Sequence, residues 1–229
     1  TVRAAHPDVW AELQLAECCG PQLADALLST VAYQELLFPG GSMDAVRSVY
    51  EHGVIAAFYN ACIVACVRSI RALLATHQRL IATEVGAGTG GTASSVLPVL
   101  SSSCSHYIFT DVSDVFLRQA RVRFAEFDFV EYALLNVDAD LKLQGFASHQ
   151  SDITISTNCL HATPFMRNTL SNCQQLLRAG GLLIINDAVR TPAFVQITFG
   201  MTDGWWLFSA VCDLERVGQH SPLLSQRQW

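Results

Sequence analysis

From residue 80 onward, the sequence alternates between short strand-like stretches and longer helix-like stretches. The strand-like stretches are apolar, rich in β-branched residues and bounded by polar turn residues, and they cover residues 79–85, 106–112, 129–137, 151–160 and 182–189. The helix-like stretches between them cover residues 92–102, 113–127 and 164–181. Alternation of this kind predicts an α/β fold with a parallel, doubly wound sheet.

The first part of the chain has a different pattern and is predicted to be helical throughout. The predicted helices cover residues 6–20, 21–30, 43–53 and 54–75, and a loop at residues 37–42 contains two adjacent glycines. Ser42 or Asp44 is placed to cap the helix that follows this loop. We therefore expect a helical part over residues 1–76 and an α/β core over residues 77–229.

Composition and charge exclude several classes of protein. The chain is 51% hydrophobic and 15% charged, which favours a substantial core over disorder. The net charge of −6, without a dense run of lysine and arginine, argues against a nucleic-acid partner. The most apolar long stretch, residues 54–75, contains Asn60, Arg68 and Arg71, so we expect a buried helix and no membrane association. The first residues do not have the pattern of a signal peptide.

Eight cysteines are scattered along the chain. Cys18 and Cys19 are adjacent, Cys62 and Cys66 lie one helical turn apart, and the others are isolated in apolar runs. There is no CxxC pair and no zinc-type spacing of cysteine and histidine. We expect reduced, mostly buried thiols, no metal site, and a cytoplasmic location.

The segment TEVGAGTGGT, residues 83–92, joins the first predicted strand to the following helix. Gly86, Gly88 and Gly90 allow a ligand to approach the backbone closely, as in several nucleotide-binding folds. Ligands of parallel α/β sheets bind at the carboxyl ends of the strands. There Asp111 lies at the end of the second strand, where it would bind ribose hydroxyls. Asn136, Val137 and Asp138 lie at the end of the third strand, where Asn136 or Asp138 would bind an adenine amino group.

The glycines alone leave the cofactor open. The dinucleotide pattern G-x-G-x-x-G fits if Gly91 is its last glycine, and a plain tight turn is a further interpretation. Glu84, however, lies two residues before Gly86 and completes E-x-G-x-G-x-G, the first motif of S-adenosylmethionine-dependent methyltransferases. Together with Asp111, this motif favours S-adenosyl-L-methionine as the cofactor and S-adenosyl-L-homocysteine as the product.

A wider resemblance covers residues 35 to 229. The sequence resembles the carbon-methyltransferase domains of modular polyketide synthases, above all those of bacterial trans-acyltransferase assembly lines. The resemblance rests on LFPGGSMDAVRSVYEHGVIAAFYN, TEVGAGTGGTASSVLPVL, YIFTDVSDVFLRQARVRF, LLNVDADLKLQGF, TNCLHATPF, LLRAGGLLIINDAV and TFGMTDGWW, which follow one another in that order. It implies a class I, Rossmann-like methyltransferase core with an N-terminal helical lid over residues 1–76. It also implies a chain that ends before the final antiparallel hairpin of the family core.

The resemblance implies a reaction and a set of site residues. The substrate would be a β-ketoacyl thioester on an acyl carrier protein, methylated at its α-carbon, and neighbouring synthase domains would be further partners. That carbon must lose a proton, and His161, directly after the fourth strand, would be the base. In the family this histidine pairs with a glutamate, and Asp187 stands at that position here. Whether this shorter side chain reaches the imidazole is a question for the structure.

The resemblance also places residues around the reacting groups. Asn158 would meet the methionine end of the cofactor. Tyr50, Tyr59 and Asn60 lie in segments similar to the helices that cover the cofactor, and Tyr50 and Tyr59 would line the substrate pocket. Trp205 and Trp206 would wall the acyl pocket, and packing in the core is the alternative role for these aromatic residues.

Two other functions remain open at this point. One is a structural domain of a synthase that has lost catalysis. The aspartate at position 187 and the missing final hairpin favour it, and the intact glycine motif with Glu84 and Asp111 opposes it. The other is a free-standing O-methyltransferase that acts on small molecules.

Overall fold

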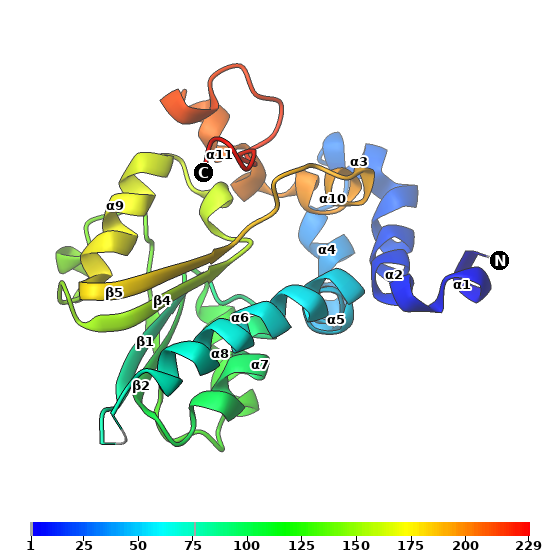
Figure 1. Cartoon of the computed structure of the whole chain (residues 1–229). Coiled ribbons are helices and arrows are strands. Elements are labelled where there is room, and N and C mark those ends of the chain that lie inside the picture. The colour runs from blue at the N-terminus through cyan, green and yellow to red at the C-terminus, as the bar shows by residue number, and fades with distance from the viewer. Residues whose placement is uncertain (1, 76) are drawn as a thin grey trace.

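The computed structural model describes residues 2–75 and 77–229. Its centre is a sheet of five parallel strands in the order β3-β2-β1-β4-β5. The strands are β1 (Leu80–Val85), β2 (Cys104–Asp111), β3 (Val130–Leu134), β4 (Ser151–Thr157) and β5 (Leu177–Asn186). The predicted α/β fold with a parallel sheet is therefore confirmed, because all the strand pairs are parallel and helices follow β1, β2 and β4 and pack on the sheet (Figure 1).

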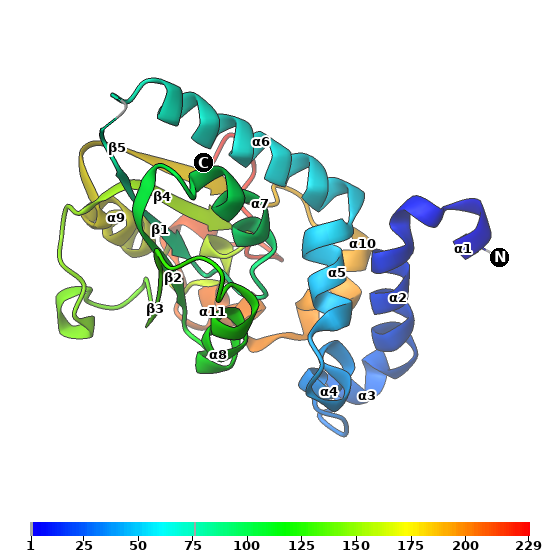
Figure 2. The same ribbon diagram turned by 90° about the horizontal axis from the view of Figure 1, so that it is seen from below.

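Helices cover both faces of this sheet. The face formed with Leu80, Ala82 and Phe109 packs against α6 (Val54–Ala72), α7 (Gly91–Leu100) and α8 (Asp114–Arg123). The opposite face packs against α9 (Met166–Leu176) through a second apolar cluster. Figure 2 shows α6 and α7 on one side of the strands and α9 on the other.

The parallel register aligns the carboxyl ends of the strands. Val85 at the end of β1 pairs with Thr110 of β2 and with Ser156 of β4. Asp111 pairs with Leu134 of β3, and Thr157 pairs with Asn186 of β5. The residues that follow these strands are thus gathered at one edge of the sheet, where parallel sheets bind ligands.

Each strand differs from its predicted range at one end or at both, and β4, for example, ends at Thr157 rather than at residue 160. β3 ends at Leu134 rather than at residue 137, so Asn136 and Val137 lie in a loop. The sequence predicts a helix over residues 164–181, but α9 ends at Leu176 and β5 starts at Leu177. Its pairing with β4 shifts between Ser151 and Ile153, and Gly180 takes up this irregularity at φ 78°.

The helices before residue 54 form a separate packing unit. They are α1 (Val2–Ala5), α2 (Trp10–Cys19), α3 (Leu23–Leu27), α4 (Tyr33–Leu37) and α5 (Asp44–His52). Their core contains Leu15, Leu37 and Val49, and Phe194 and Phe199 from the far end of the chain pack against it. Both views place α10 (Ala193–Ile197) beside α2 (Figures 1 and 2).

The remaining elements are short. The last α-helix of the described residues is α11 (Asp203–Ala210), and short 3₁₀ helices lie between and after the main elements. They are η1 (Pro7–Val9), η2 (Gly20–Gln22), η3 (Pro39–Gly41), η4 (Lys142–Gln144), η5 (Leu160–Ala162), η6 (Phe199–Met201) and η7 (Leu214–Arg216).

The prediction that residues 54–75 form a buried helix is wrong. Of α6, only Asn60, Ile63 and Val67 are buried, and they pack toward α7 and the sheet. Ile55 is 69% exposed and Phe58 is 62% exposed, so one face of this apolar helix is open. By length and composition alone α6 is a candidate membrane span. This is weak evidence for a membrane-spanning helix, because core helices of soluble proteins pass the same test.

The cysteines are all free, as predicted, but they are less buried than predicted. Cys19, Cys104 and Cys173 are buried, and Cys18 and Cys159 are partly exposed, whereas three are exposed on the surface: Cys62, Cys66 and Cys212. Cys62 and Cys66 belong to the open face of α6, so their exposure has the same cause as the wrong prediction for this helix.

Candidate active site

The glycine turn adopts a backbone that requires glycine. Gly86, Gly88 and Gly90 have φ values of 66°, 55° and 79°, in the left-handed region. A Cβ placed on Gly86 would lie 2.0 Å from Sγ of Cys159, which follows β4. The turn at the end of β1 is therefore packed directly against the segment that follows β4.

The predicted lid contacts the same turn. A Cβ on Gly91, the first residue of α7, would lie 2.6 Å from the carbonyl oxygen of Tyr50. Nδ2 of Asn60 donates to that same oxygen at 3.2 Å, and Oγ1 of Thr92 donates to Oδ1 of Asn60 at 3.0 Å. Asn60 is 4% exposed, so this link between α5, α6 and α7 is shielded from water. The end of α5 is thereby held over the start of α7.

Glu84 is the penultimate residue of β1, two positions before Gly86. It is almost fully buried, with 1% exposed. Burial raises the pKa of its carboxyl group to about 8, against the hydrogen bond from Tyr107, which lowers the pKa. The hydroxyl of Tyr107 donates to Oε2 of Glu84 at 2.7 Å. At neutral pH this carboxyl group is therefore largely protonated in the folded state.

Asp111, at the end of β2, organises the glycine turn. Its Oδ2 accepts a hydrogen bond from the backbone N–H of Gly88 at 2.9 Å, and its Oδ1 accepts one from Ser113 at 2.9 Å. Burial raises the pKa of Asp111, and these backbone donors partly offset that shift. The predicted ribose-binding carboxylate thus lies at the turn, joined to one of its glycines.

The loop after β3 is ordered by its own polar groups. Oδ1 of Asn136 accepts from the backbone N–H of Asp138 at 3.0 Å, and the side chain of Asn136 is exposed. Val137 is buried, and Nδ2 of Asn172 donates to its carbonyl oxygen at 2.8 Å. Oδ1 of Asp138 accepts from Oγ1 of Thr169 at 3.2 Å, so this loop is tied to α9.

His161 and Asp187 meet at the centre of this edge. Nδ1 of His161 lies 2.6 Å from Oδ1 of Asp187, and the backbone N–H of His161 donates to Oδ2 of Asp187 at 3.3 Å. The two side chains are only 10% and 2% exposed. The shorter aspartate therefore reaches the imidazole. Among the described residues no hydrogen bond involves Nε2 of His161, so that nitrogen is left for another partner.

Two aromatic residues complete the surroundings of this pair. Trp205 packs edge-to-face on His161, with ring centroids 5.6 Å apart, and is 3% exposed. Its buried Nε1 has no hydrogen-bond partner in the part of the chain that the structure describes. Burial and the nearby charge of Asp187 raise the pKa of the Tyr50 hydroxyl, which places this side chain close to the pair.

Known proteins are similar to this chain in sequence and in architecture. The sequence model of a family described as "Methyltransferase domain" matches residues 83–183. Polyketide synthase ThaG of Burkholderia thailandensis is 38% identical over 223 residues, which is 96% of this chain and 4% of that protein. The solved CurJ carbon methyltransferase is 33% identical, superposes with a TM-score of 0.91, and is matched over 100% of this chain and 60% of its own.

The chain belongs to the carbon-methyltransferase domains of polyketide synthases. It spans a small share of the synthases that it matches and about three fifths of the solved domain. A more distant structure, the trans-methyltransferase CalH in complex with SAH, is 27% identical with a TM-score of 0.77, over 97% of this chain and 59% of its own. These relationships support a methyltransferase domain, and the CalH complex shows that a relative binds SAH.

Not every predicted residue of this methyltransferase domain lies at the site. Tyr59 is 47% exposed and packs edge-to-face on Phe58, on the open face of α6. Trp206 is 45% exposed, and its Nε1 donates to the carbonyl oxygen of Gly200 at 2.9 Å. Of the two adjacent tryptophans, Trp205 is the one that the structure brings to His161, because neighbouring helical residues point to different sides.

Asn158 has a structural role that the sequence did not reveal. It takes the left-handed conformation at φ 47°, and its Oδ1 accepts from the backbone N–H of Ala188 at 3.2 Å. Its own N–H donates to the carbonyl oxygen of Asn186 at 2.8 Å. Asn158 thus joins the chain after β4 to the chain after β5, next to the two members of the His161–Asp187 pair.

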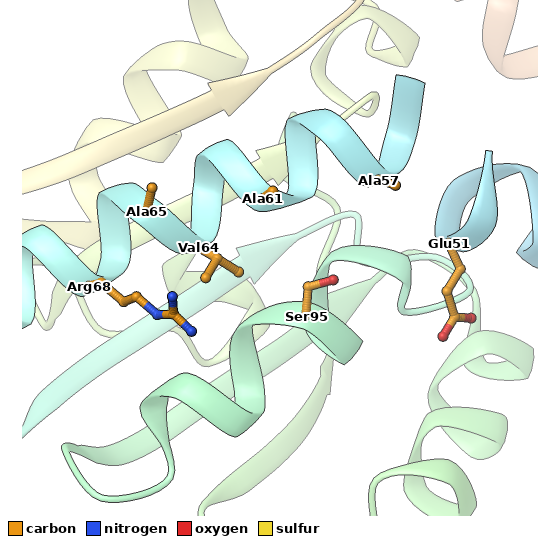
Figure 3. Close-up of a pocket in the computed structure, with 7 residues that line it drawn as sticks. All are labelled: Glu51, Ala57, Ala61, Val64, Ala65, Arg68 and Ser95. Atoms are coloured by element: carbon orange, nitrogen blue, oxygen red, sulfur yellow. The ribbon is translucent and has the colours of Figure 1, made fainter. Parts of the chain in front are cut away.

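A surface groove lies elsewhere on the methyltransferase domain. It runs between α6 and α7 and is lined by Glu51, Ala57, Ala61, Val64, Ala65, Arg68 and Ser95 (Figure 3). None of the predicted site residues is among these side chains. Among the described residues, no group of three or more histidine, cysteine or acidic side chains is arranged to hold a metal ion. The candidate active site is therefore the group of strand ends around His161, where the predicted residues gather.

Sequence reasoning also missed Arg216. This side chain is fully buried and bonds to the loop that carries His161. It lies in the polar stretch CDLERVG, where an arginine normally indicates a surface position, and nothing in that pattern signals burial.

Proposed function

We propose that this domain transfers a methyl group from S-adenosyl-L-methionine to the α-carbon of a β-ketoacyl chain, which is held as a thioester on an acyl carrier protein. The observation that carries the proposal is the 2.6 Å contact between Nδ1 of His161 and Oδ1 of Asp187 at the carboxyl ends of the strands. The family membership of the chain and its glycine turn support methyl transfer in general. The His161–Asp187 pair supports a substrate that must first lose a proton.

The pair has the properties of a general base. With its proton on Nδ1, directed to Asp187, the neutral imidazole presents the lone pair of Nε2 to the substrate. A carbon between a ketone and a thioester is acidic enough for a histidine to deprotonate. The proton moves from the α-carbon to Nε2, the electron pair remains as an enolate, and the carboxylate of Asp187 stabilises the imidazolium.

Trp205 is the group that we propose for the substrate oxygen. A buried N–H without a partner costs on the order of 1–3 kcal/mol, so such a group is expected to serve a ligand. Its ring packs against the imidazole of His161, which places the indole next to the base. Donation to the developing enolate oxygen would stabilise the charge that forms when the α-proton leaves.

The residues present fit the cofactor. A Cβ on Gly88 would meet nothing closer than the carbonyl oxygen of Gly86, at 4.0 Å, so the turn is open on that side. Glu84, the turn glycines and Asp111 would hold the cofactor with Asn136, Val137 and Asn158, and S-adenosyl-L-methionine would supply an electrophilic methyl group there. The contribution of the chain is then to position the enolate and to exclude water, for which the buried link through Asn60 holds α5 in place.

The alternative of an inactive structural domain depended on the aspartate at position 187 and on the chain ending before the final hairpin of the family core. The first of these counts less against catalysis, because this aspartate reaches the imidazole of His161. The alternative of an O-methyltransferase for small molecules is separated by experiment. Both stay as outcomes of the test below.

The test uses two acyl chains on a carrier protein, each incubated with the domain and S-adenosyl-L-methionine. One is a short β-ketoacyl chain with two α-protons, and the other carries two α-methyl groups and has no α-proton to lose. We expect methylation of the first chain alone, with fragment ions that place the methyl group on the α-carbon. Methylation of the blocked chain, or of free phenols alone, would contradict the proposal. A thermal shift with the cofactor confirms binding independently, because a ligand of the folded state raises stability.

A further inference from the structure

Arg216 is the most deeply buried charged side chain near the site, with 0% of its side chain exposed. It ends η7, and its Nε donates to Oδ2 of Asp213 at 2.6 Å. The guanidinium also lies over the ring of Phe208, with Cζ 5.2 Å from the centroid. A buried guanidinium is stable only when its donors are satisfied, and here its other three hydrogen bonds all go to one loop.

That loop is the one that carries His161. One terminal nitrogen of Arg216 donates to the carbonyl oxygen of His161 at 2.7 Å. The other donates to the carbonyl oxygens of Thr163 at 2.7 Å and Pro164 at 3.0 Å. A single planar group therefore fixes three carbonyl oxygens of residues 161–164 relative to one another.

His161 is consequently held from two sides. Asp187 accepts from its ring and from its backbone N–H, and Arg216 donates to its carbonyl oxygen. The first partner sets the tautomer and the rotation of the ring. The second fixes the peptide on the far side of the Cα atom, so the two together determine where Nε2 points. The backbone N–H and the carbonyl oxygen of His161 are thus both held by side chains from outside the loop.

We infer that Arg216 is a positioning residue for methyl transfer, which holds the loop of residues 161–164 so that Nε2 of His161 faces the α-carbon of the substrate. This inference rests on the proposed function, because it assigns Nε2 of His161 as the base. Arg216 touches neither substrate nor cofactor, and acts through the backbone of His161 and its neighbours. Lysine cannot replace it, since an ammonium group lacks the planar set of donors that spans three carbonyls.

The test compares Arg216→Lys with the wild type in three measurements. The rate of one round of methylation of a carrier-bound β-ketoacyl chain is expected to fall by about 10- to 100-fold, as for a base misplaced by a fraction of an ångström to 1 Å. The dissociation constant for S-adenosyl-L-homocysteine is expected to be unchanged. In NMR spectra of ¹⁵N-histidine-labelled protein, the ring signals of His161, assigned with His161→Ala, are expected to shift.

A matched control lies beside the site. Arg167 forms an ion pair with Glu215, the neighbour of Arg216, but its side chain is 82% exposed. Arg167→Lys is expected to leave all three measurements at wild-type values. A loss of methylation in Arg216→Lys together with weaker cofactor binding and unshifted His161 signals would indicate a purely structural role and overturn the inference, as would an unchanged rate.

A second variant covers the case in which Arg216→Lys does not fold. Asp213→Asn keeps the arginine and removes only the charge that orients its Nε, so a smaller change in the same direction is expected. Wild-type rate and signals in Asp213→Asn would then overturn the inference. A wild-type domain that binds cofactor but methylates no β-ketoacyl chain would instead be a failure of the proposed function, which is a different result.

Discussion

Asp187 holds His161 by its ring and by its backbone at once. Oδ1 lies 2.6 Å from Nδ1 of the imidazole, and Oδ2 accepts from the N–H of the same residue at 3.3 Å. The carboxylate is 2% exposed, so water does not compete for these contacts. One side chain thus sets both the tautomer of the His161 ring and the start of the loop that carries it.

Replacing this carboxylate tests its electrostatic role. Asp187→Asn keeps the size of the side chain but removes the charge that stabilises the imidazolium, so methylation is expected to fall by about 10²-fold or more. Asp187→Glu restores a carboxylate and is expected to retain more activity than Asp187→Asn. The measurement is the rate of a single turnover at saturating cofactor. Equal rates for Asp187→Asn and the wild type would show that the charge has no part in the reaction.

The Gly86–Cys159 contact predicts a strong effect on stability. Gly86→Ala adds a Cβ 2.0 Å from Sγ of Cys159 at a positive φ, so both overlap and backbone strain destabilise the fold. Gly145→Ala is the matched control, because Gly145 has φ 84° and nothing within 4 Å of an added Cβ. We expect the control to cost about 1–2 kcal/mol of unfolding free energy and Gly86→Ala to cost clearly more. Urea unfolding of both variants measures the difference, and equal losses would show that the contact relaxes freely.

The buried carboxyl of Glu84 predicts a pH dependence of stability. Burial raises its pKa from the ordinary value of 4.5 to about 8 in the folded state, so the folded protein binds the proton more tightly than the unfolded chain. The stability that this proton contributes is complete below about pH 4.5 and is lost as the pH rises through about 8.

Glu84→Gln removes this titration and keeps an acceptor for Tyr107. Between about pH 4.5 and 8, the unfolding free energy of the wild type should therefore fall relative to that of Glu84→Gln, by up to about 1.4 kcal/mol per pH unit. The measurement is urea unfolding of both proteins across this range. A difference that is constant with pH would mean that Glu84 keeps an ordinary pKa in the folded protein.

Trp205 lies beside His161 and Tyr59 lies on the surface, so replacing them is expected to have different effects on methylation. Trp205→Phe keeps an aromatic ring against His161 and removes the indole N–H, so methylation is expected to fall while cofactor binding persists. Tyr59→Ser changes an exposed side chain on α6 and is expected to alter neither methylation nor stability beyond about 0.5 kcal/mol. Both variants are assayed with the same carrier-bound chain. A loss in Tyr59→Ser, with full activity in Trp205→Phe, would reverse the assignment of the substrate pocket.

Much of this fold follows from local patterns in the sequence. The order of strands and helices is readable because each apolar strand is bounded by turn residues, and the glycine turn is readable because its chemistry depends on short spacings. His161 and Asp187 are predicted as a pair through the family resemblance and follow neighbouring strands, and the register brings those positions together. Residues that follow adjacent parallel strands meet at one edge of the sheet, so their proximity follows from the order of the elements.

The failures concern properties that depend on tertiary packing. Residues 54–75 are apolar, but burial depends on what covers the helix, and only the face toward α7 is covered. The choice between Trp205 and Trp206 depends on the rotation of α11, which two adjacent identical residues do not reveal. Arg216 is buried by three carbonyl oxygens that come from more than 50 positions earlier in the chain, and no local pattern records them.

The most direct test of the central claim is the intact mass of a carrier protein loaded with a short β-ketoacyl chain, after incubation with S-adenosyl-L-methionine and either the wild-type domain or His161→Ala. We predict that the wild type adds one methyl group to the acyl chain, and that His161→Ala adds none although it still binds S-adenosyl-L-homocysteine. Methylation by His161→Ala at the wild-type rate, or none by a wild-type domain that binds the cofactor, would contradict the claim that His161 is the base of an α-carbon methyltransferase.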